Sequence, residues 1–433
     1  MSDLKIIGGN PLNGTITPSG NKNSVLPALC ATVLTDDPVT LHKVPDLVDV
    51  NKIVDTLEDL GADINWNKNK QTLKICNKDL RLKNTKQSLP LGMRASLLLI
   101  SPVLSRFKKL SIEEKIGGCT LGIREIDPHI QMLKNMGVSI KKHNSLITLS
   151  IKDSYTAVNL WPDYASVTGT ENIIMAAVLA TGTTVLNNAA AEPHVQDLCN
   201  LLTKMGAKIE GIGSSKLVIH GVRKLTGAEF TISSDHHEIT TFLALGAMTG
   251  GRIKVKDAEP KLFPLIISEF KKLGVEIKYE ANTALVEADQ NFIPPTPFTE
   301  NFIPRIQAAP WPYLPADLLP LMVALSLRTK GPTRFWNKVY EAGLFWVSEL
   351  LKFGAKIEIC DPHRILVLGP TNLHSGGKVD CPYIIRATVA LMMTALASPG
   401  ETLLTNTETI HRAHPNFIQN LRKLGADIQE INV

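Results

Sequence analysis

Residues 117–129, with the sequence GGCTLGIREIDPH, bring together one thiol, one arginine, two carboxylates and one imidazole among three glycines. Glycine lets the backbone reach positive φ and approach a ligand closely, so the turn at Gly117 and Gly118 can present the sulfur of Cys119 from a loop. This pattern favours a reactive thiol. The alternative is an inert surface loop, because a lone thiol commonly serves as a small buried hydrophobe.

Three cations, Lys22, Arg94 and Arg386, stand at or next to the first residue of a predicted apolar helix. Helix N-termini expose unpaired N–H groups and a positive partial charge, which favour anions. A cation is unfavourable there unless an anion lies between it and the helix end. The three positions therefore predict phosphate or carboxylate ligands; the alternative is that each is a solvated surface charge.

Other helix starts carry polar groups. Residues 164–172, YASVTGTEN, could hold a diphosphate through backbone N–H groups, although serine and threonine are also common plain helix caps. Asp317 lies in a turn before an apolar helix, where it is either an N-cap or a general base with a substrate hydroxyl in reach. Arg412, like Arg386, can grip a carboxylate or phosphate through two parallel hydrogen bonds.

Two adjacent histidines, His236 and His237, lie between Asp235 and Glu238. Neighbouring residues on a helix are expected to point apart, so these four side chains are not predicted to bind a metal. No other spacing of cysteine or histidine typical of a metal site occurs. The role of the two histidines stays open at this point.

The elements that must position these residues repeat six times. In each repeat an amphipathic helix is expected to end on a left-handed glycine, after which a strand begins. The glycines, about seventy residues apart, are Gly61, Gly137, Gly206, Gly274, Gly354 and Gly425. An apolar inner helix recurs between them, predicted at residues 23–34, 94–104, 167–180, 238–248, 317–327 and 386–397. This period exceeds that of common solenoids and favours repeated compact subdomains.

The composition is that of an ordinary globular protein of 433 residues, 44% hydrophobic and 20% charged. The net charge of +5 is spread along the chain, which fits an anionic small molecule better than nucleic acid. Six widely separated cysteines indicate reduced thiols. We find no signal peptide and no apolar run of ~20 residues, so we expect a cytoplasmic protein that does not span a membrane.

Several short motifs resemble those of the enolpyruvyl transferases, and the likeness covers the entire chain. They are SGNKN at 19–23, MRAS at 93–96, GGCTLGIR at 117–124, ASV at 165–167, EP at 192–193, PAD at 315–317 and IRA at 385–387. The Gly-Gly-Cys loop favours the cell-wall branch of the family over the shikimate branch. The resemblance implies an α/β fold of two domains, an inside-out α/β barrel with six βαβαββ repeats. Domain I would be residues 22–233, with the cysteine loop, and domain II residues 1–21 and 234–433.

The resemblance also implies a reaction. Members of this branch transfer the enolpyruvyl group of phosphoenolpyruvate to the 3-hydroxyl of UDP-N-acetylglucosamine, with release of phosphate, in the first committed step of peptidoglycan synthesis. No cofactor, metal, nucleic acid, membrane or obligate protein partner is expected. By match to the motifs, Cys119 is the proton donor and the thiol that fosfomycin alkylates, Asp317 takes the hydroxyl proton, and Lys22 is a third catalytic residue.

Two binding sites are implied by the same matches. The phosphoenolpyruvate site would contain Lys22, Asn23, Arg124, Arg386 and Arg412, whose charges spread the negative charge that develops in the reaction. The UDP-sugar site would contain Arg94, Arg124, Glu125, Ile126, Asp127, Pro128, Tyr164, Ala165, Ser166, Val167, Asp317 and Val339.

The chain departs from the family pattern at several positions. Gly343 stands where the family usually has an arginine, so one anion-binding cation is missing, and Lys338 and Arg334 are candidates to replace it. The common Asp-Arg-Ile-Glu reads Asp-His-His-Glu at 235–238, the common Arg-Glu-Pro reads Ala-Glu-Pro at 191–193, and Ile116 replaces a proline. Two alternatives therefore stay open: a paralogue acting on another nucleotide or nucleoside, and a non-catalytic UDP-sugar binding protein.

Overall fold

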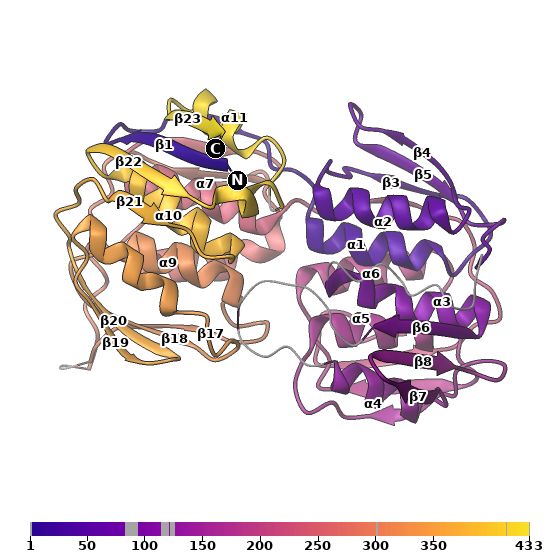
Figure 1. The fold of residues 1–433 in the computed structure, drawn as a ribbon. Coiled ribbons are helices and arrows are strands. Elements are labelled where there is room, and N and C mark those ends of the chain that lie inside the picture. Colours follow the sequence, from indigo (N-terminus) through magenta and orange to yellow (C-terminus); the bar gives the residue numbers. More distant parts are fainter. Residues whose placement is uncertain are drawn as a thin grey trace. The chain divides into compact units, whose positions relative to one another are not determined.

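A computed structural model describes residues 2–82, 94–113, 121, 126–299, 302–412 and 414–432. The chain forms two compact units (Figure 1). Unit 1 contains Met1–Ser19, Cys119–Ile123 and Ser234–Val433, and unit 2 contains Gly20–Gly118 and Arg124–Ser233. The division into domains at residues 22 and 234, expected from the sequence, stays a prediction, because compactness alone does not test whether each part folds independently.

The described part of unit 2 contains three small sheets. The first sheet has the strand order β13 (Glu229–Thr231), β3 (Val39–His42), β5 (Thr72–Cys76) and β4 (Asp63–Asn67). The second has the order β11 (Lys208–Glu210), β12 (Lys216–His220), β10 (Thr183–Asn187) and β9 (Asn159–Leu160). The third has the order β6 (Lys109–Glu113), β8 (Leu146–Ser150) and β7 (Ser139–His143). Strands β13 and β3 are parallel, as are β9 and β10, and the other neighbours are antiparallel. Parallel neighbours need a crossover connection, and between β9 and β10 a single helix, at Val167–Ala177, supplies it.

The helices of unit 2 are stacked between its sheets (Figure 1). They are α1 (Lys22–Thr32), α2 (Val48–Asp59), the 3-10 helix η1 (Arg94–Leu99), α3 (Ile100–Phe107), α4 (Asp127–Asn135), α5 (Val167–Ala177) and α6 (Pro193–Lys204). Helices α1 and α5 are buried on all sides over most of their length, whereas α2 and α6 bury one face. An apolar helix enclosed by sheets is the expected result of a sequence that is hydrophobic all round.

Unit 1 also contains three sheets. The first has the strand order β21 (Gly377–Asp380), β22 (Gly400–Thr405), β1 (Ser2–Gly8) and β23 (Asp427–Asn432). The second has the order β15 (Ile277–Glu280), β16 (Thr283–Val286), β14 (Ile253–Val255) and β2 (Gly14–Ile16). The third has the order β17 (Arg305–Ala308), β18 (Gly331–Asn337), β20 (Arg364–Gly369) and β19 (Ile357–Asp361). Each sheet has one parallel pair of neighbours: β21 with β22, β14 with β2, and β17 with β18.

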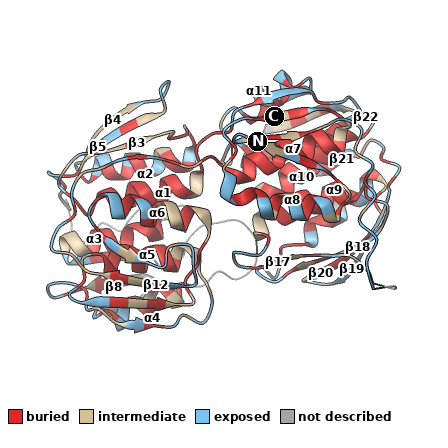
Figure 2. Cartoon of the chain, turned by 180° about the vertical axis from the view of Figure 1, so that it is seen from behind, coloured by how far each residue is buried: buried red, intermediate tan, exposed pale blue. Residues whose placement is uncertain are grey.

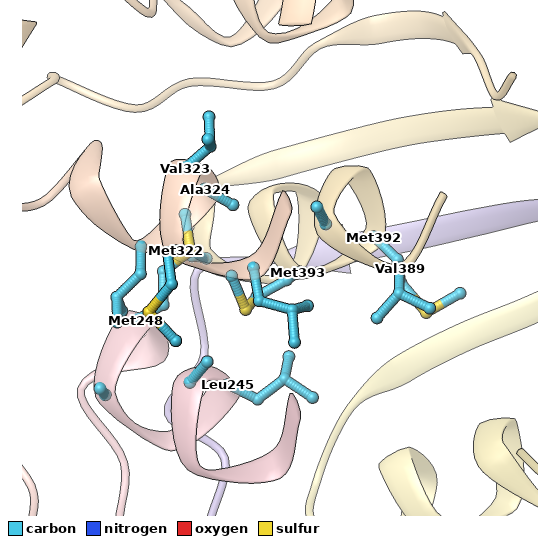
Figure 3. Close-up of a cluster of buried hydrophobic side chains, with 14 of the residues drawn as sticks. Leu245, Met248, Met322, Val323, Ala324, Val389, Met392 and Met393 are labelled. Carbon is cyan, nitrogen blue, oxygen red and sulfur yellow. The ribbon is translucent and has the colours of Figure 1, made fainter. Parts of the chain in front are cut away.

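The helices of unit 1 are α7 (His236–Thr249), η2 (Pro260–Leu262), α8 (Phe263–Lys272), η3 (Ala316–Leu318), α9 (Leu319–Ser326), η4 (Phe345–Phe353), α10 (Ile385–Ala397), η5 (Thr407–Arg412) and α11 (Phe417–Lys423). Three of them, α7, α9 and α10, are buried along nearly their whole length (Figure 2). They contact one another through a cluster of aliphatic and methionine side chains (Figure 3): Leu245, Met248, Met322, Val323, Ala324, Val389, Met392 and Met393. Burying each larger side chain stabilises the fold by roughly 1.5–3 kcal/mol.

Two strands lie just before the points where the chain passes from one unit to the other, and each pairs within the unit that the chain is leaving. Strand β2 precedes helix α1 of unit 2 but pairs with β14 in unit 1. Strand β13 precedes helix α7 of unit 1 but pairs with β3 in unit 2. Strands β2 and β13 each therefore complete a sheet whose other strands are distant in sequence.

The sixfold repeat expected from the sequence is confirmed. All six repeat glycines have positive φ, from 74° to 102°, which a side chain at these positions would disfavour. All six predicted inner helices are present, although the second and fifth begin as 3-10 turns, η1 and η3, before α3 and α9. Pro102 and Pro320 explain this change, because proline lacks the N–H for a helical bond and crowds the preceding turn. The predicted α/β class is also confirmed, and no helix in the described ranges is long and apolar enough to cross a membrane.

Candidate active site

The start of helix α7 carries a buried polar group, which we call the α7 cluster: Ser19, Asp235, His236, His237 and Glu238. Asp235 is the N-cap, and its Oδ1 accepts the N–H groups of His237 at 2.8 Å and Glu238 at 3.3 Å. Glu238 Oε2 in turn accepts the N–H of Ser19 at 2.8 Å, and also its hydroxyl. These bonds satisfy the orphan donors of the helix start and tie α7 to the segment that follows β2.

The imidazole of His237 lies between two carboxylates. Its Nδ1 is 3.1 Å from Asp235 Oδ1, and its Nε2 is 3.8 Å from Asp317 Oδ2. Because a carboxylate oxygen can only accept a hydrogen bond, the contact with Asp235 places a proton on Nδ1. Asp317 comes from the 3-10 turn η3 and has a side chain that is 39% exposed, so it is the member of this row that a substrate could reach.

Arg386, the second residue of α10, is buried next to the α7 cluster. Its Nη1 donates to Nε2 of His414 at 2.6 Å. Burial alone would raise the pKa of Asp235, but the hydrogen bond from His237 and the charges of His237, Arg386 and His414 hold that pKa well below its usual range. Asp235 is therefore ionised and compensates the buried arginine.

Glu238 behaves in the opposite way. Its pKa is raised to about 7: burial is the largest cause and the negative charge of Asp235 adds to it, while the bonds from Ser19 and the charge of Arg386 partly offset both. Two carboxyl groups three residues apart thus differ in protonation, because only one of them faces the imidazole directly.

The expectation that the two histidines point apart is wrong. The ring centroids of His236 and His237 lie 3.9 Å apart with an interplanar angle of 33°, so the rings are in contact. Ligand atoms of Asp235, His236 and His237 lie within 4.8 Å of one another and could hold a metal ion. However, Asp235 and His237 already bond each other and the charge of Arg386 opposes a cation, so a hydrogen-bond network suits the cluster better. The absence of a metal stays a prediction.

Three other predicted residues of unit 1 can be placed. Asp317 is not an N-cap, because Pro315 occupies that position of η3, and its role as a general base stays a prediction. Arg412, at the end of η5, donates from Nη1 to the hydroxyl of Tyr383 at 3.2 Å and lies over its ring. Val339 follows β18 and is exposed, and the structure does not join it to the α7 cluster.

In unit 2, Lys22 opens helix α1 next to its N-cap Asn21, and Asn23 follows. The Nζ of Lys22 lies 3.3 Å from Oδ2 of Asp49, and both side chains are largely buried. Sequence reasoning missed Asp49, although a carboxylate on the apolar face of the amphipathic helix α2 is a signal that it needs a cation. The ion pair fixes the position of the ammonium group at the helix end.

The predicted UDP-sugar segments 126–128 and 164–167 are brought together. Ile126 precedes helix α4, whose first turn contains Asp127 and Pro128, while Ser166 caps α5 by accepting the N–H of Gly169 at 3.2 Å. The ring of His129 lies 3.2 Å from the hydroxyl of Thr168, which joins the two helix starts. Of the other predicted residues in these segments, Tyr164 is exposed, and Ala165 and Val167 are partly buried.

Unit 2 also buries a carboxyl group that sequence reasoning missed. Glu171 of α5 is fully enclosed, and its Oε1 has no hydrogen-bond partner within the described ranges. Burial and the nearby charge of Glu192 raise the pKa of Glu171 well above its ordinary value, which favours the neutral form of its carboxyl group. A glutamate in the middle of an apolar helix was the available signal.

Some predicted residues lie outside the described residues: Cys119, Arg124 and Glu125, as does the side chain of Arg94, whose backbone begins η1. Leu121, within the same loop, is described. Its carbonyl accepts the N–H of Ala342 at 3.3 Å, and its side chain packs on the core of unit 1. Leu121 therefore contacts the segment where the family pattern usually has its arginine.

Gly343 has no room for a larger residue in this conformation. A Cβ there would meet the side-chain amide of Asn337, whose Oδ1 accepts the N–H groups of Val339 and Tyr340 at 3.0 Å. The nearby cation Lys338 lies over the ring of Trp336, 4.3 Å from its centroid. The turn is thus built around glycine and an asparagine that holds the backbone.

Solved structures define the class of protein to which this fold belongs. The enolpyruvyl transferase NikO from Streptomyces tendae matches with a TM-score of 0.85 at 22% identity, covering 100% of this chain and 99% of that one. EPSP synthase from Acinetobacter baumannii matches with a TM-score of 0.77 at 16% identity, covering 100% of both chains. At these identities the likeness shows the fold alone, and that fold is the enolpyruvyl transferase fold.

Sequence comparison adds the family. The profile of EPSP synthase (3-phosphoshikimate 1-carboxyvinyltransferase) matches residues 6–429. Proteins named UDP-N-acetylglucosamine 1-carboxyvinyltransferase are similar over their full length: 39% identity in Borreliella burgdorferi, covering 100% of this chain and 99% of the relative, and 36% in Bacteroides fragilis, covering 100% of both. The chain belongs to the EPSP synthase family of carboxyvinyltransferases, and the resemblance inferred from its motifs is confirmed.

Proposed function

We propose that the chain transfers the enolpyruvyl group of phosphoenolpyruvate to the 3-hydroxyl of UDP-N-acetylglucosamine and releases phosphate, the first committed step of peptidoglycan synthesis. The observation that carries this proposal is the identity of 39% with a UDP-N-acetylglucosamine 1-carboxyvinyltransferase across essentially both whole chains. The substrates are small and anionic, which suits the mildly basic chain. Action in the cytoplasm belongs to the same proposal.

The acceptor hydroxyl must lose a proton as it attacks C2 of phosphoenolpyruvate. Asp317 is the proposed base, because its carboxylate is partly exposed while its neighbour His237 is buried. Cys119 is the proposed acid, which protonates C3 of phosphoenolpyruvate and also acts in product release. General acid–base catalysis of this kind contributes about 10²–10⁴-fold to a rate.

Phosphate and carboxylate groups need fixed positive charge as bonds to them change. Arg386 is buried with its guanidinium held by His414, and Lys22 is held by Asp49, so both are pre-positioned. Arg412 and Arg124 complete the proposed phosphoenolpyruvate set, with Asn23 next to Lys22. The joined helix starts at 126–128 and 164–167 support a proposed UDP-sugar site, to which Arg94, Glu125 and Val339 are added by their motif positions.

A second candidate is transfer to another nucleotide or nucleoside. It is favoured by Gly343, because the turn around Asn337 leaves no space for the arginine that the family pattern usually has there. A site that lacks this cation would favour an acceptor, or a binding geometry, that leaves less negative charge uncompensated.

The test is phosphate release from phosphoenolpyruvate, measured with UDP-N-acetylglucosamine, with other nucleotides and nucleosides, and without an acceptor. We expect release that requires UDP-N-acetylglucosamine, is abolished by fosfomycin, and falls at least 100-fold in Cys119→Ser. The matched control is Cys360→Ser, which replaces an exposed thiol and should leave the rate within twofold of wild type.

Release with another acceptor only would replace the proposed acceptor by the second candidate. Binding of UDP-N-acetylglucosamine without any release would instead identify a non-catalytic sugar-nucleotide binding protein. Full activity of Cys119→Ser would remove the role assigned to that thiol and leave the reaction itself intact.

A further inference from the structure

His237 stands where the common family motif has isoleucine, and the proposed reaction gives it no role. Each of its ring nitrogens faces a carboxylate. A buried imidazole that simply filled space would not need two acidic neighbours on opposite sides of its ring. The position therefore calls for a function beyond packing.

The orientation of this ring is fixed from its Nδ1 side. Asp235 Oδ1 lies 3.1 Å from Nδ1 and also accepts the backbone N–H of His237 itself at 2.8 Å. His236 contacts one face of the ring. With Nδ1 holding a proton toward Asp235, Nε2 is the nitrogen that can gain or lose a proton, and it points to Asp317 at 3.8 Å.

The charged and titratable groups around His237 come from several elements. Asp235, His236 and Glu238 lie on α7 or at its cap, Asp317 lies on η3, Arg386 lies on α10, and His414 follows η5. Asp235 is ionised, so a positive imidazole would have a permanent counter-charge on its buried side. Arg386 also acts on Asp235 and shares this counter-charge with the ring.

We propose that His237 is a positioning residue that acts through Asp317 as a proton acceptor, in a row Asp235–His237–Asp317. The inference rests on the proposed function, because it assumes that Asp317 takes the proton of the acceptor hydroxyl. The O–H bond of the acceptor breaks as its oxygen bonds to C2, and the proton moves to Oδ2 of Asp317. The proton then passes from Oδ2 to Nε2 of His237, which leaves Asp317 as a carboxylate and His237 as an imidazolium beside Asp235.

The distance of 3.8 Å is longer than a hydrogen bond, so the transfer requires Asp317 to turn toward the ring. Its side chain is partly exposed, and catalytic hydrogen bonds commonly shorten when substrate is bound. The arrangement uses the same division of labour as a Ser-His-Asp triad, in which a buried carboxylate fixes the tautomer and stabilises the imidazolium. Here a second carboxylate occupies the place of the serine.

The first test compares three variants by phosphate release: His237→Gln, His237→Ile and His236→Gln. Glutamine keeps a polar contact with Asp317 but cannot carry the proton, and isoleucine restores the common family residue. We expect kcat to fall about tenfold in both His237 variants, with KM for the acceptor within twofold of wild type. The matched control, His236→Gln, changes an equally buried ring on the same helix and should lower kcat less than threefold.

The second test separates proton acceptance from packing. His237→Ala leaves a space for imidazole, so added imidazole should restore kcat of this variant by at least threefold and leave His237→Ile unaffected. A kcat within twofold of wild type in His237→Gln, a change in KM alone, or no rescue of His237→Ala by imidazole would each overturn the proposal.

A third measurement keeps the inference separate from the proposed function. If wild type releases no phosphate with any acceptor, the proposed function fails, and the row can still be examined by ¹⁵N NMR of the histidine rings. Replacing Asp317 by asparagine should move the Nε2 resonance of His237 and leave its Nδ1 resonance nearly unchanged. An unchanged Nε2 resonance would overturn the contact itself, whatever the reaction.

Discussion

The start of α7 in unit 1 and the start of α1 in unit 2 occupy equivalent places in the repeat but balance charge in opposite ways. At α7 the N-cap is an ionised carboxylate, Asp235, which faces an imidazole and a buried arginine. At α1 the N-cap is the neutral amide of Asn21, and the next residue is the cation Lys22, which forms an ion pair with Asp49 of α2.

This difference shows how the same repeat can supply a carboxylate at one helix start and a cation at another. A helix N-terminus attracts negative charge in both cases. In unit 1 the protein fills that position with its own carboxylate and can place a base, Asp317, next to it. In unit 2 the neutral cap leaves the helix end and Lys22 available to an anionic ligand. In the proposed reaction the start of α7, with Asp317, would thus serve proton transfer, and the start of α1 would serve the binding of an anion.

The largest expected effect comes from replacing the two carboxylates, Asp317 and Asp49, on which this comparison depends. Asp317→Asn should lower kcat about 10²–10⁴-fold, because the amide cannot accept the hydroxyl proton. Asp49→Asn, its counterpart in unit 2, should instead raise KM for phosphoenolpyruvate more than it lowers kcat, because it releases Lys22 from its fixed position. Steady-state phosphate release measures both constants.

Asp427→Asn is the control for these two variants, because it replaces an exposed carboxylate on β23 and should behave as wild type. A loss of kcat in Asp49→Asn as large as that in Asp317→Asn would show that the two units do not divide the work in this way.

The next effect concerns pH. The pKa of Glu238 is about 7 in the folded chain against 4.5 for an ordinary glutamate, so folding binds a proton between these values. Its favourable contribution to stability is fully present below about pH 4.5 and is lost as the pH rises through about 7. We expect Glu238→Gln to become more stable relative to wild type as pH rises from 5 to 8, by about 3 kcal/mol at most.

Glu171→Gln in unit 2 tests the same effect at a second buried carboxyl group. Burial, and next the charge of Glu192, raise the pKa of Glu171 well above its ordinary value, so the folded chain keeps a proton that the unfolded chain loses as the pH rises. Glu171→Gln should therefore also become more stable relative to wild type as the pH rises from 5 to 8. Urea unfolding at several pH values measures both. Parallel pH curves for Glu238→Gln and wild type would contradict the raised pKa of Glu238.

The smallest effect compares the caps. Ser166→Ala removes a neutral N-cap of α5 and should destabilise unit 2 by about 1 kcal/mol. Asp235→Ala removes a charged cap whose partners are buried and should cost more, about 3–5 kcal/mol. Thermal unfolding checks the order, with the exposed Ser215→Ala as the control. Equal losses in the two cap variants would mean that the ionised network adds nothing to the stability of α7.

Local features of the fold could be predicted from the sequence because they depend on neighbouring residues. A glycine after an apolar helix residue indicates a left-handed helix end, and all six such glycines have positive φ. Apolar segments without a polar face predicted the inner helices. Helix capping was one of two alternatives for the segment 164–172, and Ser166 of this segment caps α5. The family could also be inferred from short motifs, since its binding residues lie in a few continuous segments.

By itself, the sequence determined the repeat, the inner helices, the family and the residue types available for chemistry. Only the tertiary structure decided the partners of those residues: Asp49 for Lys22, His414 for Arg386, and Asp317 for His237. It also reversed the expectation that His236 and His237 point apart. The physical reason is that each pairing joins residues far apart in the chain or depends on side-chain rotamers, and both are set by how helices pack within a unit.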